Sequence, residues 1–301
     1  MEEIWLKEKK LLPRLRWVKV IEHLKSKQKF INKNQAKKIL KEKLFSVIKE
    51  RVPEKKSKKK YGIFFSGGVD SSFIAAVCNQ FNPNFTCYAV GFQDEATKAP
   101  EDVQEAQKVA RKFGFDLKFR IYNLTEVEKI IQKTVKILKL VKKVDVINVG
   151  VGAVIVAARE LARKDKINLF FSGLGSEEIF AGYERHTKVK NVNRECWRGL
   201  KQIWDRDLVR DFTLGKELKI TVKTPFLDSE LIKTAMQIPG EWKINDLEKK
   251  IILREIAEEF LGEFAWRKKK AAQYGSCFDK AIGKLAKKYG FEFKKDYLES
   301  L

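Results

Sequence analysis

A run of small, polar and acidic residues, Ser66-Gly67-Gly68-Val69-Asp70-Ser71-Ser72, has the composition of an anion-binding turn. It follows the apolar run 61–65, which has the length of a buried strand, and precedes the apolar segment 73–81, which predicts a helix. A strand that turns through glycines into a helix exposes backbone N–H groups at the helix N-terminus, and these groups bind phosphate. Glycine is needed there because a side chain would hold the backbone away from the phosphate. The sequence therefore predicts a phosphate site at this turn.

Asp70, at the centre of the turn, offers a hard carboxylate oxygen of the kind that Mg²⁺ prefers. The pattern of P-loop proteins, G-x-x-x-x-G-K-[ST], is absent from the sequence. Taken alone, S-G-G-x-D-S-S resembles the signature of the PP-loop ATP pyrophosphatases, enzymes that split ATP into AMP and pyrophosphate. The resemblance implies ATP and Mg²⁺ as cofactors.

Alternating strand-like and helix-like segments surround this turn between residues 60 and 185. The predicted strands are 61–65, 85–92, 117–124 and 167–173, and the predicted helices are 73–81, 101–114, 126–144 and 150–164. Such alternation predicts an α/β fold with a doubly wound parallel sheet. Helical patterns dominate the remaining residues, so we expect a helical C-terminal part.

The N-terminal residues mix Trp and Leu with many lysines, and we expect residues 1–35 to form a basic arm. Asn34 is expected to cap a helix over residues 35–51, because the apolar residues there recur at helical spacing. Residues 36–301 are expected to form one domain, long enough to bury an ample core.

The composition excludes several classes of protein. The chain has 63 Lys and Arg against 40 Asp and Glu, a formal net charge of +23, and 44% hydrophobic residues. It is too apolar for a disordered chain, and no stretch approaches the roughly 18 apolar residues of a spanning helix. The N-terminus lacks the apolar core of a signal peptide, so we expect a cytoplasmic protein with no membrane partner. Four scattered cysteines and two histidines indicate neither a disulfide framework nor a zinc site.

Two further motifs narrow the resemblance. Residues 172–183, S-G-L-G-S-E-E-I-F-A-G-Y, resemble the asparagine synthetase motif S-G-x-G-x-D-E-x-F-x-G-Y, and residues 225–228 match that family's P-F-L-D. Both follow the PP-loop in the expected order, and segments 249–254 and 273–276 match as well. The resemblance covers residues 36–285 and is strongest to the asparagine synthetase domain-containing proteins.

In this family a substrate carboxylate attacks the α-phosphorus of ATP, giving an acyl-adenylate and pyrophosphate, and a nitrogen nucleophile then displaces AMP. The resemblance implies that Asp70 and Glu177 would bind Mg²⁺, with Glu177 standing where the family has Asp. It implies pyrophosphate contacts from Ser66, Gly67, Gly68, Val69, Ser71 and Ser72, adenine contacts from Val90, Gly91 and Phe92, and an acyl-adenylate pocket at Ser172, Gly173 and Gly175.

Two positions depart from the family pattern. Leu174 stands where the family has Glu or Asp, and leucine can neither accept a proton nor bind an ammonium group. The family's catalytic lysine falls on Ala271, and Lys270 lies one residue earlier, so either a loop shift supplies its amine or the amine is lost. ATP binding is therefore better supported than asparagine synthesis.

Glutamine-dependent members of the family begin with Met-Cys, at the head of a glutaminase domain. This chain begins Met1-Glu2-Glu3, and about 35 residues cannot form such a domain. We therefore expect the nitrogen to come from free ammonia, from an amine substrate or from a separate glutaminase subunit.

Three functions follow from these patterns. The first is an asparagine synthetase-like ligase that acts on a small carboxylate. The second is a PP-loop enzyme that modifies tRNA, because a charge of +23 exceeds what ATP alone requires. In that case we expect a basic face beside the ATP site that binds tRNA or another polyanion, formed by the lysines at 55–60, the arm and 267–270. The third is a non-catalytic nucleotide-binding scaffold, favoured by Leu174 and disfavoured by the intact S-G-G-V-D-S-S.

Overall fold

The computed structural model describes residues 2–26, 28–95, 98–268 and 271–301. Its centre is a sheet of five strands in the order β5-β4-β3-β6-β7, and all neighbouring pairs are parallel. The strands are β3 (Tyr61–Phe64), β4 (Phe85–Phe92), β5 (Leu117–Tyr122), β6 (Leu169–Phe171) and β7 (Thr221–Lys223). The α/β fold with a doubly wound parallel sheet is confirmed. Strand β7 was not predicted, because three residues among charged neighbours show no strand-like periodicity.

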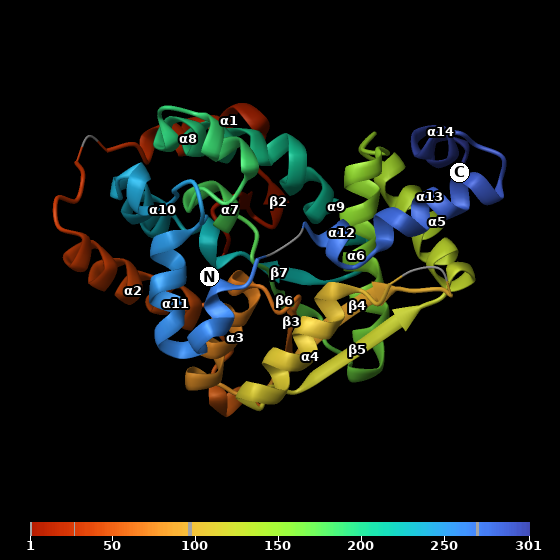
Figure 1. The fold of residues 1–301 in the computed structure, drawn as a ribbon, viewed down its shortest axis with the longest axis horizontal. Helices are drawn as coiled ribbons and strands as arrows, with labels where there is room; N and C mark the ends of the chain where they lie inside the picture. The colour runs from red at the N-terminus through yellow and green to blue at the C-terminus, as the bar shows by residue number, and fades with distance from the viewer. Residues whose placement is uncertain (1, 27, 96–97, 269–270) are drawn as a thin grey trace.

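Helices cover both faces of the sheet (Figure 1). One face is covered by α2 (Lys33–Lys49), α3 (Val69–Phe81), α4 (Glu101–Phe113), α8 (Val192–Ile203), α10 (Ser229–Gln237) and α11 (Ile251–Leu261). The other is covered by α5 (Leu124–Lys139), α6 (Val146–Ala162), α9 (Val209–Glu217), α13 (Phe278–Lys288) and α14 (Lys294–Ser300). Among the described residues, no helix combines the length and the apolar character that crossing a membrane requires.

The inner strands β3, β4 and β6 bury both of their faces, which explains why they read as continuous apolar runs. Tyr61 and Ile63 of β3 belong to the apolar core on the α3 side, whereas Phe64 packs against the core on the α6 side. Alternate residues of β4 divide between the two cores in the same way. This alternation of period two fixes which residues at each strand end face a given layer of helices.

The N-terminal residues pack onto the α3 side of the molecule. β1 (Leu6–Lys7) pairs antiparallel with β2 (Lys10–Leu11), and α1 (Arg14–His23) follows. Trp17 is fully buried, and its Nε1–H donates to the carbonyl oxygen of Leu200 at 2.9 Å. Glu3 is buried against Arg51, 3.1 Å from its Nε. These contacts join the first residues to the same core as α2 and α8.

The helix predicted over 35–51 is α2, but its N-cap is Asn32 rather than Asn34. The Asn32 side chain accepts a hydrogen bond from the Gln35 N–H at 2.9 Å. Two asparagines fall within one turn of each other, so residue type alone could not show which of them caps the helix.

The lysine run 55–60 directly precedes β3, at the amino end of the strand. The phosphate-binding turn follows β3 at its carboxyl end. The run and the turn therefore lie at opposite ends of the strand. The predicted convergence of this run with the residues beside the ATP site is therefore wrong.

Candidate active site

The phosphate-binding turn lies between β3 and α3, and Gly68 is the N-cap of the helix. Gly67 has a φ of +65°, and a Cβ there would lie 2.6 Å from the backbone carbon of Glu105 in α4. Glycine is required at 67 on both grounds. The Ser66 N–H donates to Ser71 Oγ at 3.3 Å, which folds the turn over the start of the helix. Serine hydroxyls and the N-terminus of α3 are thus gathered at one place, as an anion site needs.

Ser72 contributes a hydroxyl that the described protein groups do not satisfy. The residue is fully buried, and its Oγ has no hydrogen-bond partner among the described residues. Buried polar atoms are normally paired, so an orphaned hydroxyl behind an anion-binding turn fits a site that is completed by a ligand oxygen.

Lys250 joins the two predicted metal ligands. Its Nζ lies 2.8 and 2.9 Å from the carboxylate oxygens of Asp70 and 2.8 Å from Glu177 Oε1. Ser176 Oγ also donates to Asp70 Oδ1 at 2.6 Å. The Asp70 and Lys250 side chains are only 3% and 4% exposed, so this contact is shielded from solvent. The structure therefore brings Asp70 and Glu177 to a single cation, although more than a hundred residues separate them.

Gly182 is needed for Glu177 to reach this position. A Cβ at residue 182 would lie 1.7 Å from Glu177 Oε2 and 2.4 Å from Lys250 Cε. Any side chain there would displace the carboxylate, the lysine or both. The glycine of the F-A-G-Y segment thus has a geometric role in the site.

The donor set fits a hard divalent cation. Two carboxylates, with phosphate oxygens and water to complete the shell, are the arrangement in which proteins hold Mg²⁺ next to a nucleotide. No group of three or more His, Cys, Asp or Glu side chains in the described ranges is placed to hold a metal without such help. Asp70 and Glu177 already share one cationic neighbour, so they are the two residues that could hold such an ion.

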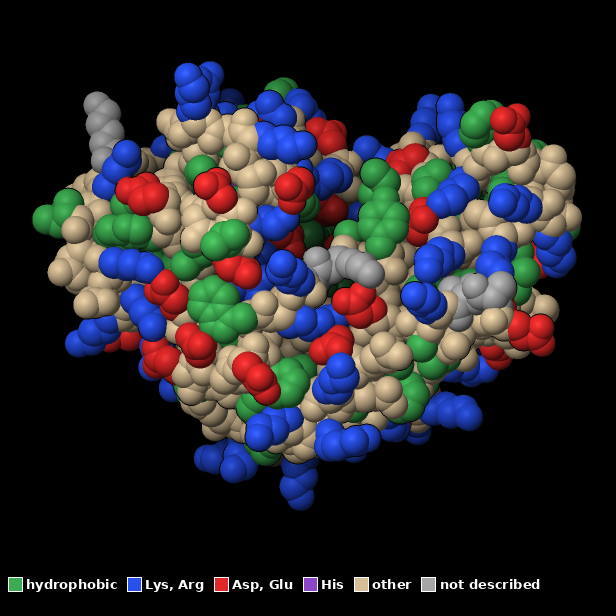
Figure 2. Space-filling view, viewed as in Figure 1, with side chains coloured by type: hydrophobic (Ala, Val, Ile, Leu, Met, Phe, Trp, Pro, Cys, Tyr) green, Lys and Arg blue, Asp and Glu red, His purple; other side chains and the backbone are tan. Residues whose placement is uncertain are grey.

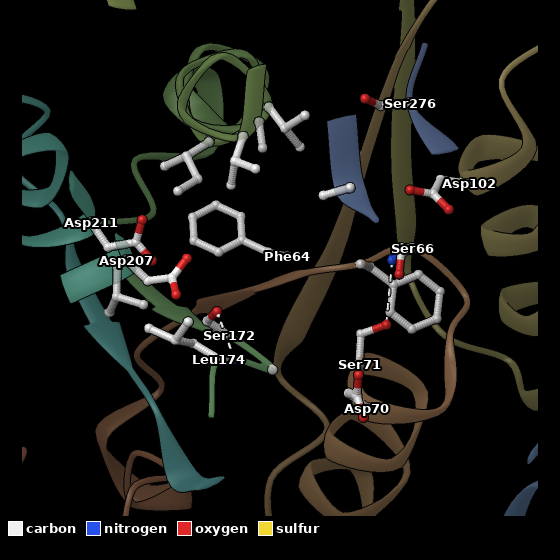
Figure 3. Close-up of a pocket in the computed structure, with 18 of the residues that line it drawn as sticks. Phe64, Ser66, Asp70, Ser71, Asp102, Ser172, Leu174, Asp207, Asp211 and Ser276 are labelled. Atoms are coloured by element: carbon white, nitrogen blue, oxygen red, sulfur yellow. Dashed lines mark hydrogen bonds between the residues drawn. The ribbon is translucent and has the colours of Figure 1, made fainter. Parts of the chain in front are cut away.

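A cavity of about 240 Å³ adjoins the turn (Figure 3). Of the residues predicted to bind ATP or the metal, its lining includes Ser66, Asp70, Ser71, Val90, Ser172, Gly173, Gly175 and Glu177. Apolar side chains of α6, with Phe64 and Leu174, form much of the remaining wall. Figure 2 shows a hollow between the two lobes of the molecule, with acidic side chains at its base.

The end of β4 places the three residues predicted to contact adenine differently. Val90 lines the cavity. Gly91 lies against Pro100, because a Cβ there would be 2.3 Å from Pro100 Cγ. The Phe92 side chain is fully buried in the core, and its N–H donates to the carbonyl oxygen of Ser276 at 2.8 Å. An adenine contact from Gly91 or Phe92 stays a prediction.

Lys270 lies outside the described residues. The described residues on either side, Lys268 and Ala271, line a larger hollow of about 820 Å³, whose lining also includes Glu177, Tyr183 and Lys250. Lys268 and Ala271 thus share a hollow with Glu177 and Lys250, and the role of Lys270 stays a prediction.

Two aspartates that were not predicted as site residues lie beside Leu174 and Phe64. Figure 3 shows Asp207 and Asp211 at this end of the cavity. Arg210 lies between them, with its NH2 nitrogen 3.1 Å from Asp207 Oδ1 and its Nε 2.7 Å from Asp211 Oδ1. Burial raises the pKa of Asp211, and the charge of Arg210 opposes the rise. The cavity wall thus has carboxylates next to the position where the leucine replaces an acid.

A π-helical segment, Trp204–Leu208, carries Asp207. One extra residue per turn rotates the following side chains, which is why such segments often occur at functional sites. In an ordinary α-helix, the alternating charges of residues 205–211 would be typical of a solvated face. The sequence therefore offered no reason to place Asp207 and Asp211 in the site.

The second acid of the S-G-L-G-S-E-E segment, Glu178, belongs to a buried hydrogen-bond network. Glu178 is buried and accepts hydrogen bonds from the Tyr183 hydroxyl, at 2.8 Å, and from Arg206. Burial raises the pKa of Glu178, and the neighbouring Arg206 opposes the rise. The network fixes the return of the chain from Glu177 to Tyr183, so the adjacent glutamates 177 and 178 have different environments.

The family model described as asparagine synthase matches residues 40–191 and 186–290. The chain belongs to the asparagine synthase family. The match overlaps the residues on which the resemblance was based, and the interpretation of this chain as an asparagine synthetase-like protein is confirmed.

Relatives from several organisms carry asparagine synthetase names. A putative glutamine-hydrolysing asparagine synthetase of Methanocaldococcus jannaschii is 31% identical over 283 residues, which cover 80% of this chain and 51% of the relative. Asparagine synthetase B of Escherichia coli is 25% identical, with 81% and 45% covered. An asparagine synthetase domain-containing protein of Saccharomyces cerevisiae is 32% identical over 133 residues, with 42% and 24% covered. The chain thus spans about half the length of the first two relatives or less.

Solved structures that match the chain include two with TM-scores below 0.5. A U34-tRNA thiolase from Methanococcus maripaludis has a TM-score of 0.42 at 13% identity, with 87% of this chain and 77% of that chain covered. An NH3-dependent NAD synthetase from Campylobacter jejuni has a TM-score of 0.35 at 16% identity, with 61% and 91% covered.

Proposed function

We propose that this chain catalyses an ATP-dependent, AMP-forming ligation, in which a carboxylate is adenylylated and ammonia or an amine then displaces AMP. The observation that carries the proposal is the convergence of Asp70 and Glu177 on Lys250, directly beside the turn 66–72 and its cavity. An anion-binding turn and two carboxylates that could hold Mg²⁺ at one site would suit cleavage of ATP between its α and β phosphates.

The residues of the turn would hold the leaving pyrophosphate. Negative charge develops on it as the α–β bond breaks, and the N-terminus of α3, the serine hydroxyls and Lys250 would stabilise that charge. Asp70 and Glu177 would hold Mg²⁺, which when bound neutralises phosphate charge. The position of Lys250 between them gives the site a cation in the absence of nucleotide, and its flexible side chain can then turn towards a phosphate oxygen.

Asp207 and Asp211 are assigned to the cationic nitrogen of the substrate or of the nucleophile. Their carboxylates line the same cavity as Ser172 and Gly173, next to Leu174. A carboxylate in a partly buried wall attracts an ammonium group and can accept its proton. The acid that is absent at 174 would thus be supplied from α9 and the segment before it.

Oxygen-isotope transfer tests this function. The chain is incubated with Mg²⁺, ATP, ammonia and carboxylate substrates labelled with ¹⁸O, starting with aspartate and other amino acids. Adenylylation requires one labelled oxygen to appear in AMP, because that oxygen attacks the α-phosphorus. ATP turnover without label in AMP would contradict the proposal for the acids tested, and labelling that survives in Asp70→Asn would contradict the role of Asp70. A non-catalytic scaffold would bind ATP without turning it over.

A further inference from the structure

A second hollow, of about 880 Å³, lies between residues 25–26 and 28–29 on one side and the start of α8 on the other. Figure 1 shows α8, which lines it, beside α1 at the top of the view. Among the described residues, six basic side chains line this basic groove: Lys25, Lys29, Lys190, Arg194, Arg198 and Lys201. The acid in its described lining, Glu195, is buried and pairs with Arg185 at 2.9 Å and with Arg198 at 3.3 Å. The groove is therefore strongly cationic.

Three of these cations have no carboxylate neighbour in the described ranges. Lys25 and Lys201 both pair with Glu22, and Arg198 pairs with Glu195. The side chains without such a pair are Lys29, Lys190 and Arg194, and all three are exposed. A folded protein gains nothing in stability from gathering unpaired like charges, so their convergence indicates an anionic partner.

The lining also carries groups that suit nucleotides. Trp197 is half-buried and offers part of its ring among the cations, and Gln28 adds an exposed amide. Asn191 caps α8 within the groove, so the positive end of the dipole of a twelve-residue helix lies there as well. RNA-binding surfaces usually combine three kinds of group. Cations bind the phosphates, aromatic rings stack on bases, and amides hydrogen-bond to the polar edges of bases.

The groove continues towards the candidate active site through one short segment. Val189, Lys190 and Asn191 line the groove, whereas Glu184, Arg185 and Thr187 line the open hollow that contains Glu177 and Lys250. The Arg185–Glu195 ion pair joins the two linings. We propose that the basic groove binds the phosphate backbone of an RNA and leads it towards the mouth of the nucleotide cavity.

Binding of a fluorescent tRNA to the whole chain tests this inference. Binding is measured without ATP over a salt series, so its outcome is independent of any ligase activity. The groove variant carries Lys29→Glu, Lys190→Glu and Arg194→Glu. The control variant carries Lys55→Glu, Lys56→Glu and Lys59→Glu, which change the net charge equally at exposed positions at the amino end of β3. Glutamate at 194, three residues after the cap Asn191, suits the first turn of α8.

The groove variant should bind at least about tenfold more weakly at moderate salt. Its log-log salt slope should be shallower by about 2 to 3, because each of the three lost phosphate contacts contributes roughly 0.7–0.9. The control variant should keep nearly the wild-type slope. Equal losses in both variants, no binding by wild type at low salt, or equal competition by polyglutamate would overturn the proposal. If the groove variant fails to fold, wild type cross-linked to 4-thiouridine RNA decides: cross-links should map to 189–201, and cross-links confined to other segments would refute it.

Discussion

Replacing Lys250 with methionine removes the cation that Asp70 and Glu177 share while keeping the length of the side chain. Asp70 Oδ2 and Glu177 Oε1 lie at most 5.6 Å apart, the sum of their two 2.8 Å contacts with Nζ. In Lys250→Met the two negative charges would face each other at this distance without a cation between them, and the Asp70 carboxylate is buried.

The expected cost can be bounded from the geometry. One contact of 2.8 Å between unit charges is worth roughly 6 kcal/mol at an effective dielectric constant of about 20. Desolvation of both partners offsets much of that attraction, and removal of one partner from a buried pair costs about 3–5 kcal/mol of unfolding free energy. We expect a loss in this range for Lys250→Met in urea unfolding without Mg²⁺ or nucleotide.

The neighbouring residue provides a matched control. Lys249 pairs with Glu184 on the surface, where the two side chains are 36% and 70% exposed, so Lys249→Met should cost no more than about 1 kcal/mol. Mg²⁺ should stabilise Lys250→Met more than it stabilises wild type or Lys249→Met at equal ionic strength, because the metal takes the place of the ammonium group. Formation of AMP should be lost in Lys250→Met alone. Equal stability and equal ATP turnover of the two variants would show that Lys250 is not the cation that Asp70 and Glu177 depend on.

Two further results follow from the site and its surroundings. Asp211→Asn should raise KM for the carboxylate substrate or the amine about tenfold, which corresponds to about 1.4 kcal/mol, and should leave KM for ATP unchanged. A change in KM for ATP alone would contradict the assignment of Asp211 to the substrate nitrogen. Burial, and next the charge of Arg185, lowers the pKa of His186 from 6.5 to about 4, so the folded protein holds this imidazole neutral. The stability gained by burying the neutral imidazole is fully present above pH 6.5 and is lost as pH falls towards 4. In urea unfolding, the stability of wild type relative to His186→Gln should therefore decline between pH 6.5 and 4, and a constant difference would contradict this account.

The sheet and the turn could be predicted because their signals are local. Apolar runs of strand length alternate with helical periods, and the glycines of 66–68 interrupt them at the end of a strand. The short strand β7 carries no such signal, because tertiary pairing with β6 alone defines it. The N-cap of α2 shows the usual uncertainty at element ends.

The site could be predicted only as far as the motifs reach. The motifs imply roles for Asp70 and Glu177. Lys250 lies in the matching segment 249–254, but no role was assigned to it, because it follows Glu248 and Lys249 in a charged run that gives no sign of burial. Its left-handed backbone, with a φ of 59°, and its position before α11 turn it inward, and neither can be read from residue type. The basic groove was likewise unpredictable, since its cations come from separate segments that only the fold brings together.

The products of ATP labelled at the α-phosphate test the central claim most directly. With Mg²⁺, ammonia and an accepted carboxylate, the chain should release labelled AMP and unlabelled pyrophosphate in equal amounts, and Asp70→Asn should release neither. Labelled ADP with inorganic phosphate as the sole products would show that the turn at 66–72 directs cleavage to the γ-phosphate and would contradict the account.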